Sequence, residues 1–340
     1  MSKKFNLAIV GATGFVGQAV LTILQQRKFP INHLYLLASE RSSGEIMEFN
    51  KQQLIVSDLV EFDFKQADIA IFTAGSDVSA QYVPKATQNA CLVIDNTPQF
   101  RYDDDVPLII PEVNPEALAG YKKRRIIANP NCSTIQMLVA LKPIYDAVGI
   151  MRINVVTFQS VSGAGKAAFY ELIQQAGQLL NGLPIKQPKA FTQQIAFNVI
   201  PHIDEFVENG YTREEMKMVW ETKKIFADPE IQVNPTAVRV PVFHGHSEAV
   251  HIETKKKISV DQVKQLLKKA PGVLVIDKLA NNGYPTPISH SGSDKVLVGR
   301  LREDISHPLG LDLWIVADNI RKGAALNAVQ IAELMIKHII

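Results

Sequence analysis

Cys132 lies at the predicted amino end of a helix, inside the segment NPNCST at residues 129–134. The Pro-Asn pair favours a turn, and Ser133 or Thr134 could cap the helix that follows. Partial positive charge at a helix amino end favours the thiolate, the nucleophilic form of cysteine. That end supplies about 0.3–1 kcal/mol, whereas lowering a thiol pKa by two units requires about 2.7 kcal/mol. Catalysis by Cys132 would therefore need further cationic or hydrogen-bonding neighbours.

A glycine-rich turn, Gly11-Ala12-Thr13-Gly14-Phe15-Val16-Gly17, joins a predicted strand at residues 5–10 to a predicted helix. Gly11 allows a tight turn, Gly14 lets backbone amides approach a pyrophosphate, and Gly17 lets helix and strand pack closely. The helix amino end adds unpaired N–H groups and partial positive charge. We therefore expect a dinucleotide site, with a purely structural turn as the alternative.

The turn after the second predicted strand, residues 34–38, bears on the choice between NAD and NADP. An acidic side chain here binds the ribose diol of NAD, whereas Arg with hydroxyl groups holds the 2′-phosphate of NADP. Glu40, Arg41 and Ser42 offer both kinds of group. Arg41 and Ser42 occupy the positions where the turn should meet the ribose, so we expect NADP. A solvated turn is the alternative.

The elements around these residues predict two domains. Short apolar segments alternate with helical ones as far as residue 130, which indicates a Rossmann-type doubly wound parallel sheet with helices on both faces. Strands then dominate without regular βαβ spacing, which indicates a mixed α+β domain. We expect an NADP-binding domain at residues 1–130 and 320–340 and a catalytic and dimerisation domain at 131–319. The predicted strands are 5–10, 34–38, 69–73, 92–95, 152–159, 236–242, 248–254 and 311–317, and the predicted helices are 19–26, 78–90, 133–147, 167–180, 260–269 and 326–340.

Composition excludes several classes of protein. The 340 residues are 46% hydrophobic and 21% charged, with 36 Lys and Arg against 34 Asp and Glu, so no basic excess points to nucleic acid. No apolar stretch reaches the roughly 18 residues of a membrane span. The two cysteines make no disulfide framework, and Cys91 lies in an apolar segment where a buried, inert thiol is expected. We expect a cytoplasmic protein.

Several segments, in family order and over essentially the whole chain, resemble the aspartate-β-semialdehyde dehydrogenase family. They are Gly11–Gly17, Asp95–Asn114, Asn129–Thr134, Gln159–Gly165, Glu221–Ile225, Arg239–Glu248 and Asp318–Glu333. One departure is Thr97-Pro98-Gln99, where the family has small hydroxyl and Ala residues. The resemblance implies reversible, NADP-dependent conversion of L-aspartyl-4-phosphate to L-aspartate-4-semialdehyde and phosphate, in the biosynthesis of lysine (through diaminopimelate), methionine, threonine and isoleucine. It also implies a homodimer or homotetramer.

The resemblance implies a role for each matching residue. The catalytic residues would be the nucleophile Cys132, the general acid/base His246 and Gln159, which orients the substrate. Arg239 would bind the substrate carboxylate and Glu221 its amino group. Phosphate would be bound by Arg101 and Lys224, and the NADP site would be lined by Gly11, Thr13, Gly14, Phe15, Val16, Gly17, Arg41, Ser42, Ser162, Gly163 and Asn319.

The chemistry of these side chains agrees with the implied roles. A thioester pathway needs a soft nucleophile that can also leave, which suits a thiolate. A proton must move as the thiohemiacetal forms or collapses, and His suits that task. Arg239 offers a planar fork for a carboxylate. We expect His246 to protonate the oxyanion during the collapse.

Other interpretations stay open on the residues alone. His244, His246 and His251 could hold a metal, although no acidic or Cys pattern completes a tetrahedral set, so we expect none. Glu221 and Lys224 have the i,i+3 spacing of an ordinary surface ion pair on a helix. The alternative activities are N-acetyl-γ-glutamyl-phosphate reductase, whose acetylated substrate nitrogen would not need an acid such as Glu221, and a non-catalytic NADP-binding homologue.

Overall fold

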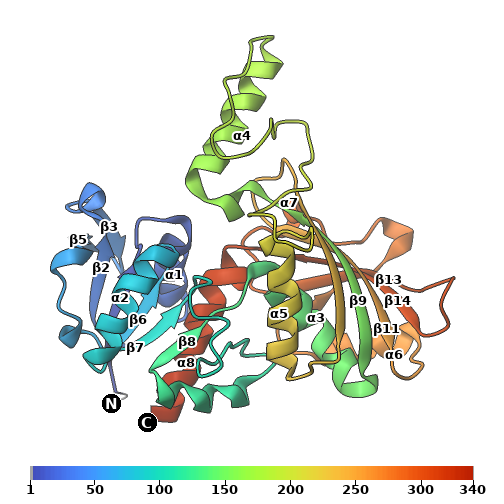
Figure 1. Ribbon diagram of the computed structural model, residues 1–340, viewed down its shortest axis with the longest axis horizontal. Coiled ribbons are helices and arrows are strands. Elements are labelled where there is room, and N and C mark those ends of the chain that lie inside the picture. Colours follow the sequence, from blue (N-terminus) through green and yellow to red (C-terminus); the bar gives the residue numbers. More distant parts are fainter. Residues whose placement is uncertain (1–2, 340) are drawn as a thin grey trace. The chain divides into compact units, whose positions relative to one another are not determined.

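The computed structural model describes residues 3–339, which form two compact units. The first unit contains the described residues up to Asn131 together with those from Ala324 onward. The second unit runs from Cys132 to Gly323. Each unit contains a six-stranded sheet (Figure 1). The glycine-rich turn therefore belongs to the first unit, and Cys132 opens the second.

The six-stranded sheet of the first unit is parallel throughout. Its order is β5-β2-β1-β6-β7-β8, which is the 3-2-1-4-5-6 order of a doubly wound fold once the separate β3–β4 hairpin is left aside. The predicted Rossmann-type sheet is thus confirmed. The strands are β1 (Phe5–Val10), β2 (Ile31–Ala38), β5 (Ser57–Asp58), β6 (Ile69–Phe72), β7 (Leu92–Asp95) and β8 (Ile126–Ala128), and the hairpin is β3 (Ile46–Phe49) and β4 (Gln52–Ile55).

Two helices of the first unit, α1 and α2, begin earlier than their apolar spacing predicts, whereas α8 begins at Leu326 as predicted. Helix α1 begins at Phe15 rather than at residue 19, because the glycine turn continues directly into helical backbone. Helix α1 packs against α8, and apolar side chains of both join the core beneath β1. The helices are α1 (Phe15–Gln26), α2 (Ser76–Gln88) and α8 (Leu326–Ile339), with 3₁₀ turns η1 (Glu40–Ser42), η2 (Leu59–Glu61), η3 (Phe64–Gln66) and η4 (Pro115–Lys123).

The sheet of the second unit is mixed, as the α+β prediction requires. Its order is β10-β9-β11-β14-β13-β12; β9 pairs in parallel with β10 and antiparallel with β11. The strand predicted at 236–242 instead ends at Arg239, shortly before Pro241, which has no N–H to continue the ladder. The strands are β9 (Ile150–Gln159), β10 (Gln232–Arg239), β11 (His246–Thr254), β12 (Val273–Val275), β13 (Val296–Glu303) and β14 (Gly310–Ala317).

Helix α3 packs across the middle of this sheet and α5 packs against β10. Helix α3 begins at Cys132 itself, so Ser133 and Thr134 lie within its first turn and the predicted capping role was wrong. Helix α5, which the sequence analysis did not predict, runs beside α3 (Figure 1). The helices are α3 (Cys132–Val148), α4 (Gly165–Leu180), α5 (Arg213–Phe226), α6 (Val260–Lys269) and α7 (Pro287–His290), with η5 (Val161–Ala164), η6 (Leu279–Asn281) and the π-helical η7 (Arg321–Ala325).

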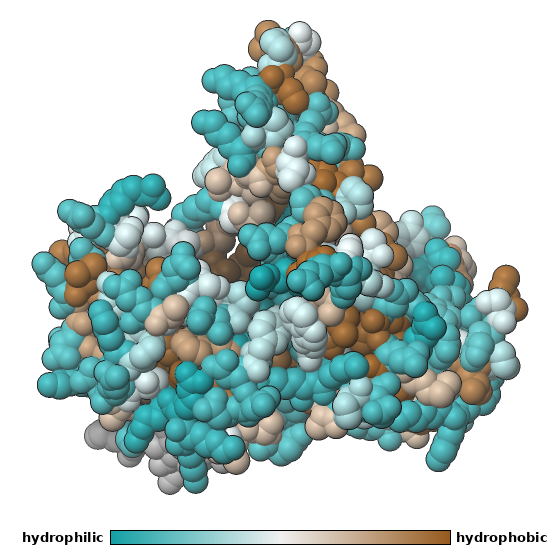
Figure 2. Space-filling model, viewed as in Figure 1, coloured by the Kyte–Doolittle hydropathy of each residue, from teal (hydrophilic) through white to brown (hydrophobic). Residues whose placement is uncertain are grey.

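Helix α4 and the segment that follows it extend away from the sheet of the second unit (Figure 1). Tyr170, Ile173 and Leu180 of α4 are exposed, and Figure 2 shows hydrophobic side chains among hydrophilic ones over this helix. Within residues 3–339, however, every helix is too short or too polar to span a membrane.

Candidate functional site

The glycine-rich turn of the first unit brings β1 and α1 into very close contact. A Cβ added at Gly17 would lie 2.3 Å from the backbone oxygen of Gly11 and 2.7 Å from that of Ala12. Gly11 has a φ of +86°, and a Cβ there would lie 2.8 Å from Thr73 Oγ1. A side chain at Gly17 would therefore force β1 and α1 apart, and one at Gly11 would clash with the segment that follows β6.

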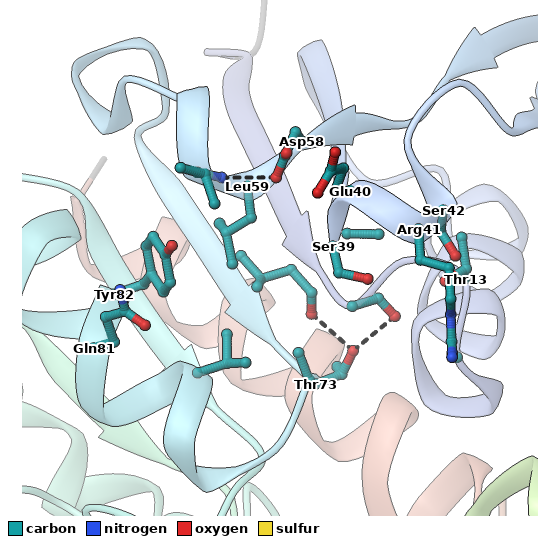
Figure 3. A pocket seen from close by; sticks show the side chains of 17 residues that line it. Thr13, Ser39, Glu40, Arg41, Ser42, Asp58, Leu59, Thr73, Gln81 and Tyr82 are labelled. Carbon is teal, nitrogen blue, oxygen red and sulfur yellow. Dashed lines mark hydrogen bonds between the residues drawn. The ribbon is translucent and has the colours of Figure 1, made fainter.

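A cavity of about 520 Å³ opens at the carboxyl ends of β1, β2 and β6 (Figure 3). Thr13, Arg41 and Ser42 lie together on one side of it, and Gln81 and Tyr82 lie on another. Gly11 and Gly14 also line the cavity. The remaining residues expected in the NADP site of this unit occupy the start of α1 and are absent from the lining: Phe15, Val16 and Gly17.

The cavity has the features of a dinucleotide site. It lies where β1 adjoins both β2 and β6, the point at which the strand order reverses and ligands of doubly wound folds bind. The N-cap residue of α1 is Gly14, which has no side chain to stand between this helix end and a phosphate, and helix amino ends attract phosphates. Glu40 and Arg41 both line the cavity, and both are exposed.

Arg101 is held in the first unit by the loop that follows β7. Asp95, fully buried at the end of β7, accepts hydrogen bonds from the backbone N–H and Oγ1 of Thr97 and from Ser79 Oγ. Burial raises the pKa of Asp95, while these hydrogen bonds and the positive charge of Arg101 oppose the rise. Arg101 Nη2 donates to the carbonyl oxygen of Asn96 over 2.7 Å. Thr97, where this sequence departs from the family pattern, thus still has a hydroxyl group, and its hydrogen bond to Asp95 stabilises this loop.

Cys132 is the first residue of α3, and it is partly exposed. A Cβ added at Gly323 would lie 2.8 Å from the Cβ of Cys132, so only glycine leaves room there for the thiol-bearing side chain. Burial lowers the pKa of Arg239, and Glu214 and Cys132 oppose that fall, so Cys132 lies within electrostatic reach of Arg239. Arg239 is therefore a candidate for the cationic neighbour that the Cys132 thiolate would need.

Three strand ends gather the other expected catalytic groups at one edge of the second unit's sheet. Gln159 ends β9, Arg239 ends β10 and His246 begins β11. Gln159 and Arg239 are paired across the parallel β9–β10 ladder. His246 lies at the same edge because β11 runs antiparallel to β9.

His246 is fully buried, and its environment favours the neutral ring. The backbone N–H of Ser160 donates to Nδ1 over 3.1 Å, which assigns the proton of the neutral ring to Nε2. Burial lowers the pKa of His246 from 6.5 to about 3, with the positive charge of Arg239 adding to the fall and Glu214 opposing it. His246 therefore presents an Nε2–H donor at neutral pH.

Arg239 is buried beside His246 with most of its donors uncommitted. Nη1 donates to the carbonyl oxygen of Ser160 over 2.8 Å, and this is the one hydrogen bond of the Arg239 side chain among residues 3–339. Burial lowers the pKa of Arg239, while Glu214 and Cys132 oppose the fall. A Cβ at Gly163 would lie 3.1 Å from Nη1 of Arg239 and 3.2 Å from Cε1 of His246, so the Gly163 backbone lies directly against both.

Asn319 ties together the segments around His246. Its Oδ1 accepts hydrogen bonds from Ser160 Oγ at 3.1 Å, Ser162 Oγ at 3.3 Å and the backbone N–H of Gly245 at 2.9 Å. Asn319 and Ser162 are both buried. These contacts make Asn319 a support for the loops that carry Ser162 and Gly163.

Glu221 and Lys224 both project from α5, one turn apart. Glu221 is fully buried and Lys224 is partly buried. The alternative of an ordinary surface ion pair is therefore wrong, because a surface pair requires two exposed groups.

The three histidines do not form a metal site. Among residues 3–339, no group of three or more His, Cys, Asp or Glu side chains could hold a metal ion. The ring of His244 packs 5.3 Å from that of Phe169, and His251 lies beside Asp304 and Asp312. The predicted inert thiol, Cys91, is fully buried; burial, with a contribution from Asp68, raises its pKa to about 12.

Sequence reasoning missed Ser160 and Glu214. Ser160 contacts His246, Arg239 and Asn319, and its place directly after Gln159 was the available signal. Glu214 lies near the start of α5, where an acid is expected for the helix dipole alone, and Glu215 completes a capping box with Thr212. Nothing local in the sequence distinguishes Glu214 from such an acid.

Comparisons with known proteins cover both units. Residues 6–121 match the model of the semialdehyde dehydrogenase NAD-binding domain, and residues 141–322 match that of the semialdehyde dehydrogenase dimerisation domain. An aspartate-semialdehyde dehydrogenase of Legionella pneumophila is 62% identical over 98% of this chain and 96% of its own.

Solved structures agree with these matches. Aspartate semialdehyde dehydrogenase II of Vibrio cholerae, complexed with ASA, superposes with a TM-score of 0.97 at 58% identity, covering 99% of each chain. Aspartate semialdehyde dehydrogenase of Candida albicans, solved with NADP, has a TM-score of 0.75 at 26% identity, covering 99% of this chain and all of its own. The chain belongs to the aspartate-semialdehyde dehydrogenase family.

Proposed function

We propose that this oxidoreductase of aspartate-family amino-acid biosynthesis reduces L-aspartyl-4-phosphate to L-aspartate-4-semialdehyde through a thioester on Cys132, with release of phosphate and use of NADPH. The observation that carries the proposal is the gathering of Gln159, Arg239 and His246 at one sheet edge, with Cys132 within electrostatic reach of Arg239. One cysteine, one proton donor and one guanidinium are the groups that this chemistry requires.

Cys132 is the nucleophile of the proposed reaction. Its thiolate attacks the acyl carbon, the C–O bond to phosphate breaks, and a thioester forms. The amino end of α3 and the Arg239 guanidinium both favour the thiolate. The leaving phosphate requires separate cations, and Arg101 and Lys224 take this role.

His246 is the proton donor. Because Nδ1 accepts from the Ser160 backbone, the Nε2–H faces outward from that contact and can donate to the oxygen of the tetrahedral intermediate. Donation stabilises the developing oxyanion and gives the thiohemiacetal hydroxyl. When the C–S bond breaks, that proton returns to Nε2 of His246, the Cys132 thiolate leaves and the aldehyde remains. A neutral His246 needs no prior titration to act as this donor at pH 7.

Arg239 and Glu221 bind the amino-acid part of the substrate. The uncommitted donors of Arg239 suit a bidentate pair with the α-carboxylate. Glu221 supplies a buried acid for the ammonium group. An N-acetylated substrate has no such charge to offer, so this acid favours aspartyl phosphate over N-acetyl-γ-glutamyl phosphate.

NADP is the proposed cofactor, and when bound it supplies or accepts the hydride. Arg41 and Ser42 line the cavity next to Thr13 and suit a 2′-phosphate, whereas Glu40 lines the same cavity beside Asp58 (Figure 3). The Candida albicans relative solved with NADP supports this choice. Gly11, Gly14 and the start of α1 suit the pyrophosphate, and Ser162, Gly163 and Asn319 of the second unit are the proposed nicotinamide-side residues.

We further propose a cytoplasmic homodimer or homotetramer. The match of residues 141–322 to a dimerisation domain supports assembly through the second unit. The proposed division of labour assigns the dinucleotide to residues 1–130 and 320–340, and catalysis and assembly to 131–319.

An absorbance assay of NADPH formation from L-aspartate-4-semialdehyde tests this function. We expect activity that requires phosphate and is much lower with NAD than with NADP. Activity without phosphate would contradict the acyl-phosphate mechanism, and preference for N-acetyl-glutamate semialdehyde would contradict the substrate. The Arg41→Ala variant should raise the NADP KM about 10-fold or more, since it removes a charged contact, with Glu40→Gln as the matched control that should not.

A further inference from the structure

Gln159 has both hydrogens of its amide group committed inside the protein. Nε2 donates to Glu214 Oε1 over 3.1 Å and to Thr157 Oγ1 over 3.3 Å. A primary amide has two N–H donors and one carbonyl acceptor. Oε1 accepts no hydrogen bond from any residue in the described part of the chain, and it is the one polar group that Gln159 has left to offer.

Glu214 imposes this orientation because it is held as a carboxylate. Its Oε2 accepts a hydrogen bond from Lys217 Nζ over 2.9 Å, and the same ammonium group donates to Asp204 over 2.7 Å. Burial acts to lower the pKa of Lys217, but Glu214 and Asp204 raise it overall, so the cation persists between the two acids. A carboxylate can only accept hydrogen bonds. Turning the Gln159 amide over would place two acceptor oxygens against each other.

Glu214 also lies close to two of the residues assigned to the reaction. Its negative charge acts on both Arg239 and His246, and it is buried beside them. Position and charge together connect α5 to the sheet edge that carries the proposed reaction. None of the catalytic roles assigned above uses Glu214.

We propose that Glu214 is a positioning residue that fixes the Gln159 amide with its carbonyl oxygen toward the reacting centre. Gln159 then serves as a hydrogen-bond acceptor, and it does not donate to an oxyanion. Its partner would be the hydroxyl group of the thiohemiacetal, which receives its proton from His246 and returns it to His246 when the aldehyde forms. His246 and Gln159 thus divide the work: one donates to the oxygen and the other accepts from it. This inference rests on the proposed function.

A double-mutant cycle tests the proposal on the full-length enzyme. Glu214→Gln keeps the shape but can donate as well as accept, so the Gln159 amide can turn over. We expect kcat to fall about 10- to 100-fold, the scale on which misplaced catalytic groups act, with little change in NADP affinity. In a Gln159→Ala background, Glu214→Gln should cause no further loss of kcat. Glu205→Gln is the control, since it removes an exposed carboxylate just before α5 and should leave kcat unchanged.

The double-mutant cycle separates a positioning role of Glu214 from an independent one. Equal losses of kcat from Glu214→Gln with and without Gln159 would overturn the positioning role, since Glu214 would then act independently of the amide. An unchanged kcat in Glu214→Gln would overturn it too. No effect of Gln159→Ala alone would instead count against the proposed catalytic role of Gln159. If Glu214→Gln does not fold, Glu214→Asp replaces it, because the shorter carboxylate keeps the charge beside Lys217 but withdraws from Gln159.

A readout independent of turnover is hydrogen exchange at the Gln159 side-chain amide, followed by NMR. The two Nε2 protons should exchange slowly in the wild type, because both are hydrogen-bonded in a buried site. Exchange should accelerate in Glu214→Gln and stay slow in Glu205→Gln. Rapid exchange in the wild type would contradict the assigned orientation.

Discussion

Cys132 and Cys91 are the same chemical group in opposite surroundings. Cys132 begins a helix, is partly exposed and has the Arg239 guanidinium within electrostatic reach. Cys91 is sealed beneath apolar residues, where burial and the negative charge of Asp68 raise its pKa to about 12. A thiol is reactive where its anion is stabilised and inert where its anion is excluded. The same comparison applies to two buried acids: Glu214 accepts a hydrogen bond from the Lys217 ammonium, whereas Glu248 is fully buried and makes no ion pair among residues 3–339.

The largest expected effect separates the two thiols. Cys132→Ala should reduce kcat more than about 10⁴-fold, because no other group can form the thioester. Cys91→Ala should leave kcat within about twofold and cost roughly 1 kcal/mol of stability through the small cavity it opens. NADPH absorbance measures the first effect, and urea unfolding measures the second.

Alkylation tests the same difference in reactivity between Cys132 and Cys91. Iodoacetamide at pH 7 should label Cys132 and spare Cys91 in the folded protein, as read by mass spectrometry of tryptic peptides. Equal labelling of both, or turnover that survives Cys132→Ala, would remove the distinction between a reactive and a sealed thiol.

The next effect concerns the histidine of the same sheet edge. His246→Asn should lower kcat about 10²- to 10⁴-fold, the range of a lost proton donor. Because the folded-state pKa of His246 is about 3, wild-type kcat/KM should show no ionisation of this residue between pH 5 and 8.

Stability gives an independent check of that pKa. Below pH 6.5 the unfolded His246 binds a proton that the folded protein excludes, so stability falls as the pH drops, by up to about 1.4 kcal/mol per pH unit from this group. His246→Asn should remove that share of the fall between pH 6.5 and 4. An unchanged pH profile in the variant would show that His246 is charged in the folded state.

Much of the architecture was predictable from local pattern. Apolar strands between helices indicated the parallel sheet, and the glycine spacing indicated the close packing that Gly17 shows. Helix α5 was not predicted because its first residues are polar and its acidic and lysine residues hide the apolar spacing of a helix. Strand β10 runs from Gln232 to Arg239, whereas we predicted it at 236–242, so both ends were wrong. The apolar alternation in the sequence continues past Arg239, but the hydrogen-bonded β-ladder ends there.

The site was predictable only where a residue type carries its own chemistry. Cys132 and His246 were identifiable because their side chains are a nucleophile and a proton donor, and the family resemblance assigned them these roles. Ser160 acts through backbone groups, which every residue possesses. Glu214 reaches Gln159 across 55 positions of the chain, a contact that exists only once β9 and α5 have packed. Tertiary contacts of this kind leave no local signature.

A smaller effect should follow from changing the shape of a cation at the site. Arg239→Lys keeps the charge but loses the planar fork, so the KM for the semialdehyde should rise about 10- to 100-fold, the equivalent of one or two lost hydrogen bonds to a charged group. The Kd for NADP should stay unchanged, as measured by fluorescence titration. The exposed Arg302→Lys is the control. A loss of NADP binding in Arg239→Lys would show that this guanidinium serves the cofactor.

The smallest expected effect is on the stability of the protein, at Glu248, which is fully buried like Cys91. Burial raises the pKa of Glu248 well above 4.5, with Gln136 of α3 opposing the rise. The folded state therefore keeps a proton that the unfolded state loses above pH 4.5, and stability falls as the pH rises. Glu248→Gln removes this proton linkage while retaining the shape, so it should stabilise the protein by about 1–3 kcal/mol at pH 8.

Urea unfolding of both proteins at pH 5 and pH 8 measures the difference. The advantage of Glu248→Gln should shrink toward pH 5, where the unfolded acid also holds much of its proton. Glu253→Gln, on the same strand but partly exposed, should show no such pH-dependent gain. A destabilised Glu248→Gln at pH 8 would mean that the buried carboxylate is ionised and has a favourable partner, and Glu248 would then resemble Glu214 in its electrostatics.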